Sequence, residues 1–186
     1  LAARVPDIEV VAVEREPALA ALARENAALN GLANRVHVLE GDVADAAIRR
    51  TLPPCAHGFA NPPYWQDGTA PPDATRRAAT HDAGAGLTAW AATLAAAIRP
   101  RGSATLILPA ARFADGLGAL GGAGFGSPAL LPLWPRIGVA AKRVILAVRR
   151  DGRGPGRVLP GLVLHEGQAT TREAEAVLRG GQRLAV

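Results

Sequence analysis

The chain has 186 residues, of which 49% are hydrophobic, enough for one domain with a buried core. Its formal charge is +5 and its sequence pI is about 10.8, which favours a polyanionic partner, nucleic acid before membrane. The apolar stretches are too short to span a bilayer and no basic-then-apolar leader opens the sequence, so neither a membrane partner nor secretion is expected. The single cysteine, Cys55, cannot form an internal disulfide and fits a cytoplasmic location.

The charge alone leaves nucleic-acid binding open, because the GC-rich codon usage of some genomes also produces an arginine-rich chain. The chain contains no methionine, so Leu1 is not expected to be a native translation start. Residues 1–6 read as the tail of a helix running into a strand, and we therefore expect further residues upstream.

Apolar runs and breaking residues predict the elements of the first third. Strands are expected at residues 8–13, 35–39 and 57–60, with a helix from Pro17 to the stop at Asn30-Gly31. Each strand leads into a polar residue: Glu14, then Asp42 after a short turn, then Asn61.

In the rest of the chain, expected strands and helices alternate less regularly. Residues 62–84 are rich in Pro, Asp, Thr and Arg and predict a long functional or disordered loop. Helices are expected at residues 87–98, 111–120 and 173–178. Strands are expected at residues 104–108, 129–131, 143–148 and 158–164. A flexible glycine-rich break is expected at 121–126 and a turn at 151–156. The strand at 143–148 has no crossover helix before it and is expected to be antiparallel.

Alternating strands and helices predict an α/β fold of one domain, residues 1–186, with a doubly wound, mostly parallel sheet. Such sheets bind ligands outside the carboxyl ends of their strands. We therefore expect Glu14, Asp42 and Asn61 to lie on one rim.

Two of these residues are candidates for holding a nucleoside. Glu14 can accept hydrogen bonds from ribose hydroxyls, and the alternative is a solvated carboxylate at a strand end. Asp42 can accept from the exocyclic amine of an adenine while Val43 packs beside the ring. The alternative is that Asp42 caps the next helix.

The sharpest signal is Asn61-Pro62-Pro63-Tyr64, directly after an expected strand. The Asn61 amide oxygen and a backbone carbonyl of the double-proline turn can accept both hydrogens of a planar amine. Its lone pair then points at an incoming methyl group, and alignment and desolvation supply the catalysis. Proline fixes φ and frees a neighbouring carbonyl, and Tyr64 offers a stacking face. The alternative is a proline-rich surface turn.

Three residues of the long loop are candidates for contacting a substrate. Trp65 can extend the stacking platform, or it can cover the core. Arg76 and Arg77 can hold phosphates, or they can be solvated. Four scattered histidines and one cysteine do not have the spacing of a metal site.

The motif resembles the marker of class I S-adenosylmethionine-dependent methyltransferases that modify exocyclic or amide nitrogen. The extended loop 61–68, Arg77-Ala78 with His81, Trp134-Pro135-Arg136, the segment 141–144 and the tail 159–164 together are similar to the tRNA(valine) adenine-N6 methyltransferase family. This resemblance implies S-adenosylmethionine as cofactor and an adenine of RNA, expected to be tRNA, as substrate.

The resemblance also implies roles for single residues. Glu14 would bind the cofactor ribose, and Asp42 and Val43 its adenine. Asn61 would also contact the cofactor and, with Pro62, Pro63 and Tyr64, would hold the target base. The family's first strand and its Gly-rich loop, which cradles the cofactor, are absent from this chain. That strand is expected at the centre of the sheet, between the strands that end at Glu14 and at Asn61.

Two other functions stay open at this point. A protein glutamine-N5 methyltransferase uses the same loop chemistry on an amide nitrogen, and a Rossmann-like RNA-binding module that has lost its cofactor site would lack the Gly-rich loop. The sequence does not indicate an oligomeric state.

Overall fold

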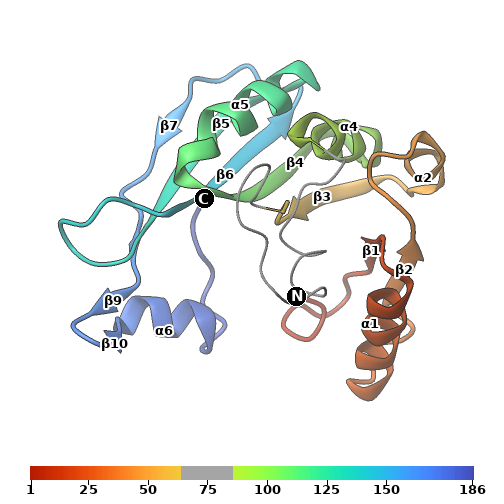
Figure 1. Cartoon of the computed structure of the whole chain (residues 1–186), viewed down its shortest axis with the longest axis horizontal. Coiled ribbons are helices and arrows are strands. Elements are labelled where there is room, and N and C mark those ends of the chain that lie inside the picture. Colours follow the sequence, from red (N-terminus) through yellow and green to blue (C-terminus); the bar gives the residue numbers. More distant parts are fainter. Residues whose placement is uncertain (64–85) are drawn as a thin grey trace, which may run out of the picture. The chain divides into compact units, whose positions relative to one another are not determined.

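The computed structural model describes residues 1–63 and 86–186, which form two compact units, residues 1–53 and residues 54–186 (Figure 1). Each unit is described by itself. No helix in the described ranges is both long and apolar enough to cross a bilayer.

The first unit is built on two parallel strands, β1 (Val10–Glu14) and β2 (Val36–Glu40), joined by helix α1 (Pro17–Leu29). The helix begins with its proline in the first turn, where the missing N–H costs nothing, and ends at Asn30 before Gly31 at φ 67°. Its buried side chains are alanines rather than leucines. A short helix, α2 (Ala46–Thr51), follows β2 and is capped by the Asp45 carboxylate.

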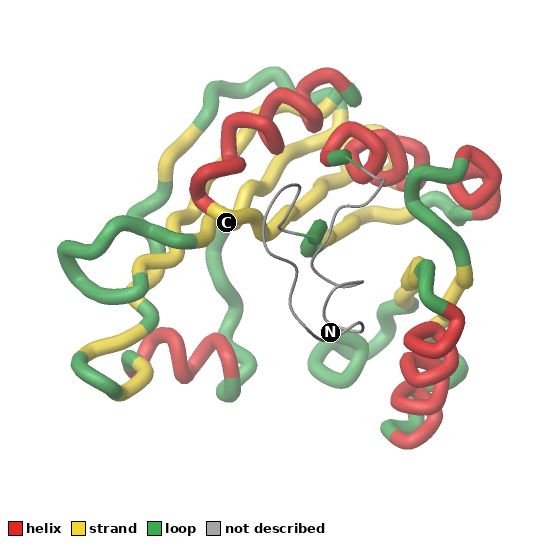
Figure 2. Tube along the Cα trace, in the orientation of Figure 1, coloured by secondary structure: helices red, strands yellow, loops and turns green. Residues whose placement is uncertain are grey.

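The second unit contains a six-stranded sheet in the order β3-β4-β6-β5-β7, with β8 also paired to β5. Figure 2 shows the strands in yellow. The strands of this sheet are β3 (Cys55–Ala60), β4 (Ile98–Pro109), β5 (Phe125–Trp134), β6 (Arg143–Arg150), β7 (Arg157–Val158) and β8 (Leu162–Val163). Only β6 runs against its neighbours, so the expected antiparallel late strand is confirmed.

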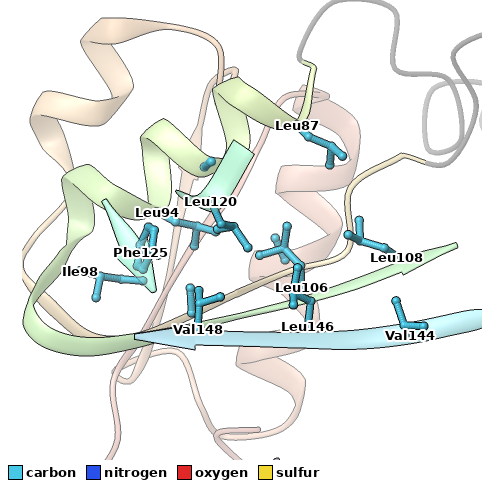
Figure 3. Close-up of a cluster of buried hydrophobic side chains, with 13 residues drawn as sticks. Leu87, Leu94, Ile98, Leu106, Leu108, Leu120, Phe125, Val144, Leu146 and Val148 are labelled. Atoms are coloured by element: carbon cyan, nitrogen blue, oxygen red, sulfur yellow. The ribbon is translucent and has the colours of Figure 1, made fainter. Parts of the chain in front are cut away.

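One face of this sheet carries the main core. Helices α4 (Leu87–Ala97) and α5 (Phe113–Gly122), the latter preceded by a 3-10 turn at Ala110–Arg112, supply buried side chains against alternate strand positions. Leu106 and Leu146 point from adjacent strands toward Leu94 and Leu120 (Figure 3). This alternation is that of strands whose even positions face a helical layer.

A smaller apolar cluster includes Ile145, whose side chain points away from the main core because it alternates with the buried residues of β6. Its other partners include Leu131, Leu162 and Ala174 on helix α6 (Arg172–Leu178). The strands β9 (His165–Glu166) and β10 (Ala169–Thr170) form a hairpin before that helix.

Two expectations about local structure were wrong. The glycine-rich segment 121–126 is not a flexible break, because α5 continues through Gly122 and β5 begins at Phe125. The segment 158–164 is not one strand, because Leu159, Pro160 and Gly161 interrupt it and Gly161 adopts φ 90°. A proline and a left-handed glycine do not fit inside a regular strand.

Within the described ranges, β1 pairs only with β2, and β3 pairs only with β4. Each of these two strands therefore has one edge without a described ladder partner.

Candidate functional site

Glu14 is the last residue of β1, as expected from the apolar run before it. Its Oε1 accepts a hydrogen bond of 2.9 Å from the backbone N–H of Glu16, which fixes the carboxylate at the start of α1. Among the described residues no hydrogen bond reaches Oε2. That oxygen is the one available to accept from a ligand hydroxyl.

Asp42 lies two residues beyond the end of β2, which pairs directly with β1. Its Oδ1 accepts from the backbone N–H of Ala44 at 2.8 Å, and its Oδ2 lies 3.8 Å from Nη1 of Arg15. The helix cap is Asp45, not Asp42, so the alternative role of Asp42 as a helix cap is wrong. Arg15 joins the two strand ends, and sequence reasoning did not single it out.

Val43 is buried, with 8% of its surface exposed, and its carbonyl accepts a hydrogen bond from Arg49. Its side chain offers little free surface of its own to a ligand.

In the second unit, Asn61 directly follows β3 and is exposed, whereas Pro62 behind it is buried and Pro63 is half-buried. The parallel ladder to β4 ends with Ala60 opposite Leu106, so Asn61 lies directly after the paired part of β3. A buried proline anchors the turn while the amide residue stays at the surface. This arrangement suits a side chain that must meet a ligand in a fixed place.

Four expected site residues, Tyr64, Trp65, Arg76 and Arg77, lie outside the described residues. No group of three potential metal ligands occurs in the parts of the chain that are described.

A polar contact that sequence reasoning missed links β3 to β4. Nδ1 of His57 lies 2.8 Å from Oγ of Ser103, its register partner. Partial removal from water lowers the pKa of the His57 imidazole below its ordinary value, although much of the side chain remains exposed. Only the register of the two strands, which the sequence does not specify, brings these residues together.

Glu14 and Asp42 are the acceptors of the first unit that could hold the adenosyl part of S-adenosylmethionine. Glu14 ends β1, and Asp42 follows the end of β2 by two residues. The two paired strands lie roughly 5 Å apart. In each carboxylate one oxygen is held by a backbone N–H. Such prearranged acceptors are what a ribose diol and an exocyclic amine require.

The comparisons with known proteins concern the fold and the cofactor of the chain. No protein-family model matches the chain. The chain is 32% identical over 108 residues, 56% of its length, to a tRNA1(Val) (adenine(37)-N6)-methyltransferase of Actinobacillus succinogenes, of which it covers 44%. The chain thus spans less than half the length of that curated relative.

Among solved structures, a predicted O-methyltransferase from Agrobacterium tumefaciens matches 96% of this chain and 81% of its own, with a TM-score of 0.78 and 25% identity. A SAM-dependent O-methyltransferase from Thermotoga maritima matches 79% of this chain and 51% of its own, with a TM-score of 0.54 and 14% identity. The chain has the class I methyltransferase fold. The expected resemblance to methyltransferases that use S-adenosylmethionine is confirmed by these names.

Proposed function

We propose that the protein transfers the methyl group of S-adenosylmethionine to the exocyclic N6 of an adenine in RNA, and that this RNA is tRNA. The observation that carries the proposal is the exposed Asn61 on a buried proline at the carboxyl end of β3. The name of the curated relative, a tRNA adenine-N6 methyltransferase, supports the substrate. A tRNA substrate is also consistent with the positive net charge and the expected cytoplasmic location.

In this proposal the two carboxylates bind different parts of the cofactor. Oε2 of Glu14 accepts from the ribose hydroxyls and Asp42 accepts from the adenine amine, with Val43 behind it. The bound cofactor supplies an electrophilic methyl group. The Asn61 amide oxygen and a carbonyl of the proline turn then hold the target amine, and Tyr64 stacks on its base.

The target adenine must leave its stack, or already be exposed in a loop, to reach such a turn. We propose that residues 1–186 belong to one methyltransferase domain. The match of a single solved methyltransferase to 96% of the chain supports this.

The test is transfer of a labelled methyl group from S-adenosylmethionine by the full-length protein, offered tRNA and, separately, a protein substrate that carries an accessible glutamine. We expect label in N6-methyladenosine of tRNA, and loss of that label in Asn61→Ala. Asn26→Ala, the same change at an exposed helix position outside the motif, is the matched control and keeps the activity.

Two results would count against the proposal. Label in the protein rather than in RNA would support the glutamine-N5 alternative. Tight cofactor binding without transfer to any RNA would remove the proposed reaction.

A further inference from the structure

The loop between β5 and β6, residues 135–142, lies at the same edge of its sheet as Asn61. β5 is antiparallel to β6, β6 is antiparallel to β4, and β4 is parallel to β3. The carboxyl ends of β3 and β5 therefore lie at the same edge of the sheet, with β4 and β6 between them, and the loop leaves β5 from that edge (Figure 1). β6, which receives the loop, is two strand spacings from β3, about 10 Å.

The loop is strongly cationic. Residues 134–143 contain Arg136, Lys142 and Arg143 and no acidic residue. Arg136 and Lys142 are exposed, and neither takes part in an ion pair within the described ranges. Exposed cations without carboxylate partners are available to phosphate groups.

The loop is also held in place. Trp134 donates its indole N–H to the carbonyl of Pro160 at 3.0 Å, and Arg136 donates Nε–H to the carbonyl of Gly167 at 3.0 Å. At the other end the carbonyl of Lys142 accepts from the N–H of Ala110 at 3.0 Å. A loop fixed at both ends loses little conformational freedom on binding.

The tip of this loop presents apolar side chains to water. Ile137 is 83% exposed and Val139 is 43% exposed, on either side of Gly138 at φ 74°. A fixed, exposed isoleucine between cations offers a surface for the face of a base or a ribose.

We propose that residues 135–142 form a second contact for the RNA substrate. Arg136 and Lys142 bind phosphates that flank the target nucleotide, and Ile137 packs against a neighbouring base or sugar. This inference rests on the proposed function only in taking RNA as the substrate.

The test measures binding of fluorescently labelled tRNA to the full-length protein over a range of salt concentrations. Lys142→Gln should weaken binding about 3-fold to 10-fold, and the double variant with Arg136→Gln by more than 10-fold. The salt dependence of the double variant should fall by about 1.5 in log–log slope, since each phosphate contact contributes roughly 0.7 to 0.9. The single variant leaves the Arg136–Gly167 hydrogen bond intact, so it reports on charge without disturbing the loop.

The matched control removes two positive charges away from the loop, one in the turn after β6 and one in β7, beside the middle of β5. Arg153→Gln with Arg157→Gln changes exposed arginines in and after the turn that follows β6, and should alter tRNA binding by less than about 3-fold. A photo-crosslinking amino acid at position 137 should capture tRNA. Equal losses in loop and control variants, no loss in either, or a crosslink only to protein would overturn the inference.

Failure of the reaction is separate from failure of this contact. If the loop variants lose tRNA binding and position 137 crosslinks to tRNA, the contact stands even when no methyl group is transferred. If methyl transfer to tRNA occurs while the loop variants bind and react like the parent, the contact is wrong and the reaction stands.

Discussion

Oδ2 of Asp42 lies 3.8 Å from Nη1 of Arg15, across the ends of the two paired strands β1 and β2. Both side chains are more than a third exposed, 34% for Asp42 and 41% for Arg15. An ion pair that long and that exposed contributes little to stability. Arg15 is therefore a weak competitor for the carboxylate and leaves it available to a ligand.

Substitutions of Asp42 and Arg15 should therefore have different effects on the affinity for S-adenosylmethionine. Asp42→Ala should lower the affinity for S-adenosylmethionine about 10-fold to 100-fold, because a hydrogen bond to a charged acceptor is lost. Arg15→Gln should change the affinity by less than about 3-fold. Isothermal titration calorimetry measures both, and a larger loss in Arg15→Gln than in Asp42→Ala would reverse the assignment.

Asn61 is expected to act as a hydrogen-bond acceptor, and two substitutions test whether its side-chain oxygen is needed for activity. Asn61→Ala removes the acceptor and should lower kcat about 100-fold or more, since misalignment of a reacting group costs that much. Asn61→Asp keeps an acceptor oxygen and should retain more activity than the alanine variant, with the affinity for the cofactor similar in both. Steady-state kinetics on tRNA give the comparison, and equal loss in the two variants would argue against an acceptor role.

The backbone of Gly126 lies so close to the backbone of Gly152 that there is no room for a side chain at position 126. A Cβ placed there would stand 2.1 Å from the carbonyl oxygen of Gly152, so Gly126→Ala must displace the turn after β6. We expect a loss of about 2 kcal/mol or more in the free energy of unfolding. Gly118→Ala, inside α5 with open space around it, should instead stabilise by about 0.5 to 1 kcal/mol. Urea unfolding of both variants makes the comparison, and equal effects would show that the close approach does not matter.

The sequence predicted those parts of the fold that depend on local pattern. The apolar runs before Glu14 and Asn61 placed both residues at strand ends, and the proline and glycine signals bounded α1 correctly. The late antiparallel strand followed from the lack of a crossover before Arg143.

Features that depend on contacts between distant residues were not predictable in this way. Gly126 reads as flexible until the carbonyl of Gly152 is brought against it. The apolar residues around Pro160 and Gly161 suggested a continuous strand, although that segment bends to bring the Pro160 carbonyl to the Trp134 indole. The conformation of the loop at 135–142 depends on such tertiary contacts, so it could not be predicted from the sequence either.

His57 predicts a dependence of stability on pH. Its imidazole has a lowered pKa in the folded chain because it is partly removed from water, whereas the unfolded chain keeps a value near 6.5. As the pH falls below about 6.5, the unfolded state binds the proton first, so this contribution to stability is present above that pH and is lost as the pH falls through the folded pKa.

His57→Gln removes that titration while leaving a polar group that can face Ser103. The free energy of unfolding should therefore fall less between pH 7.5 and 5, taken as roughly spanning the titration of a histidine, in His57→Gln than in the parent protein. His37→Gln, the same substitution at an exposed position of β2, is measured alongside it for comparison. Urea titrations at several pH values measure the slopes. An unchanged slope in His57→Gln would mean that the partial burial of this ring between β3 and β4 does not influence folding, and that its contact with Ser103 serves orientation alone.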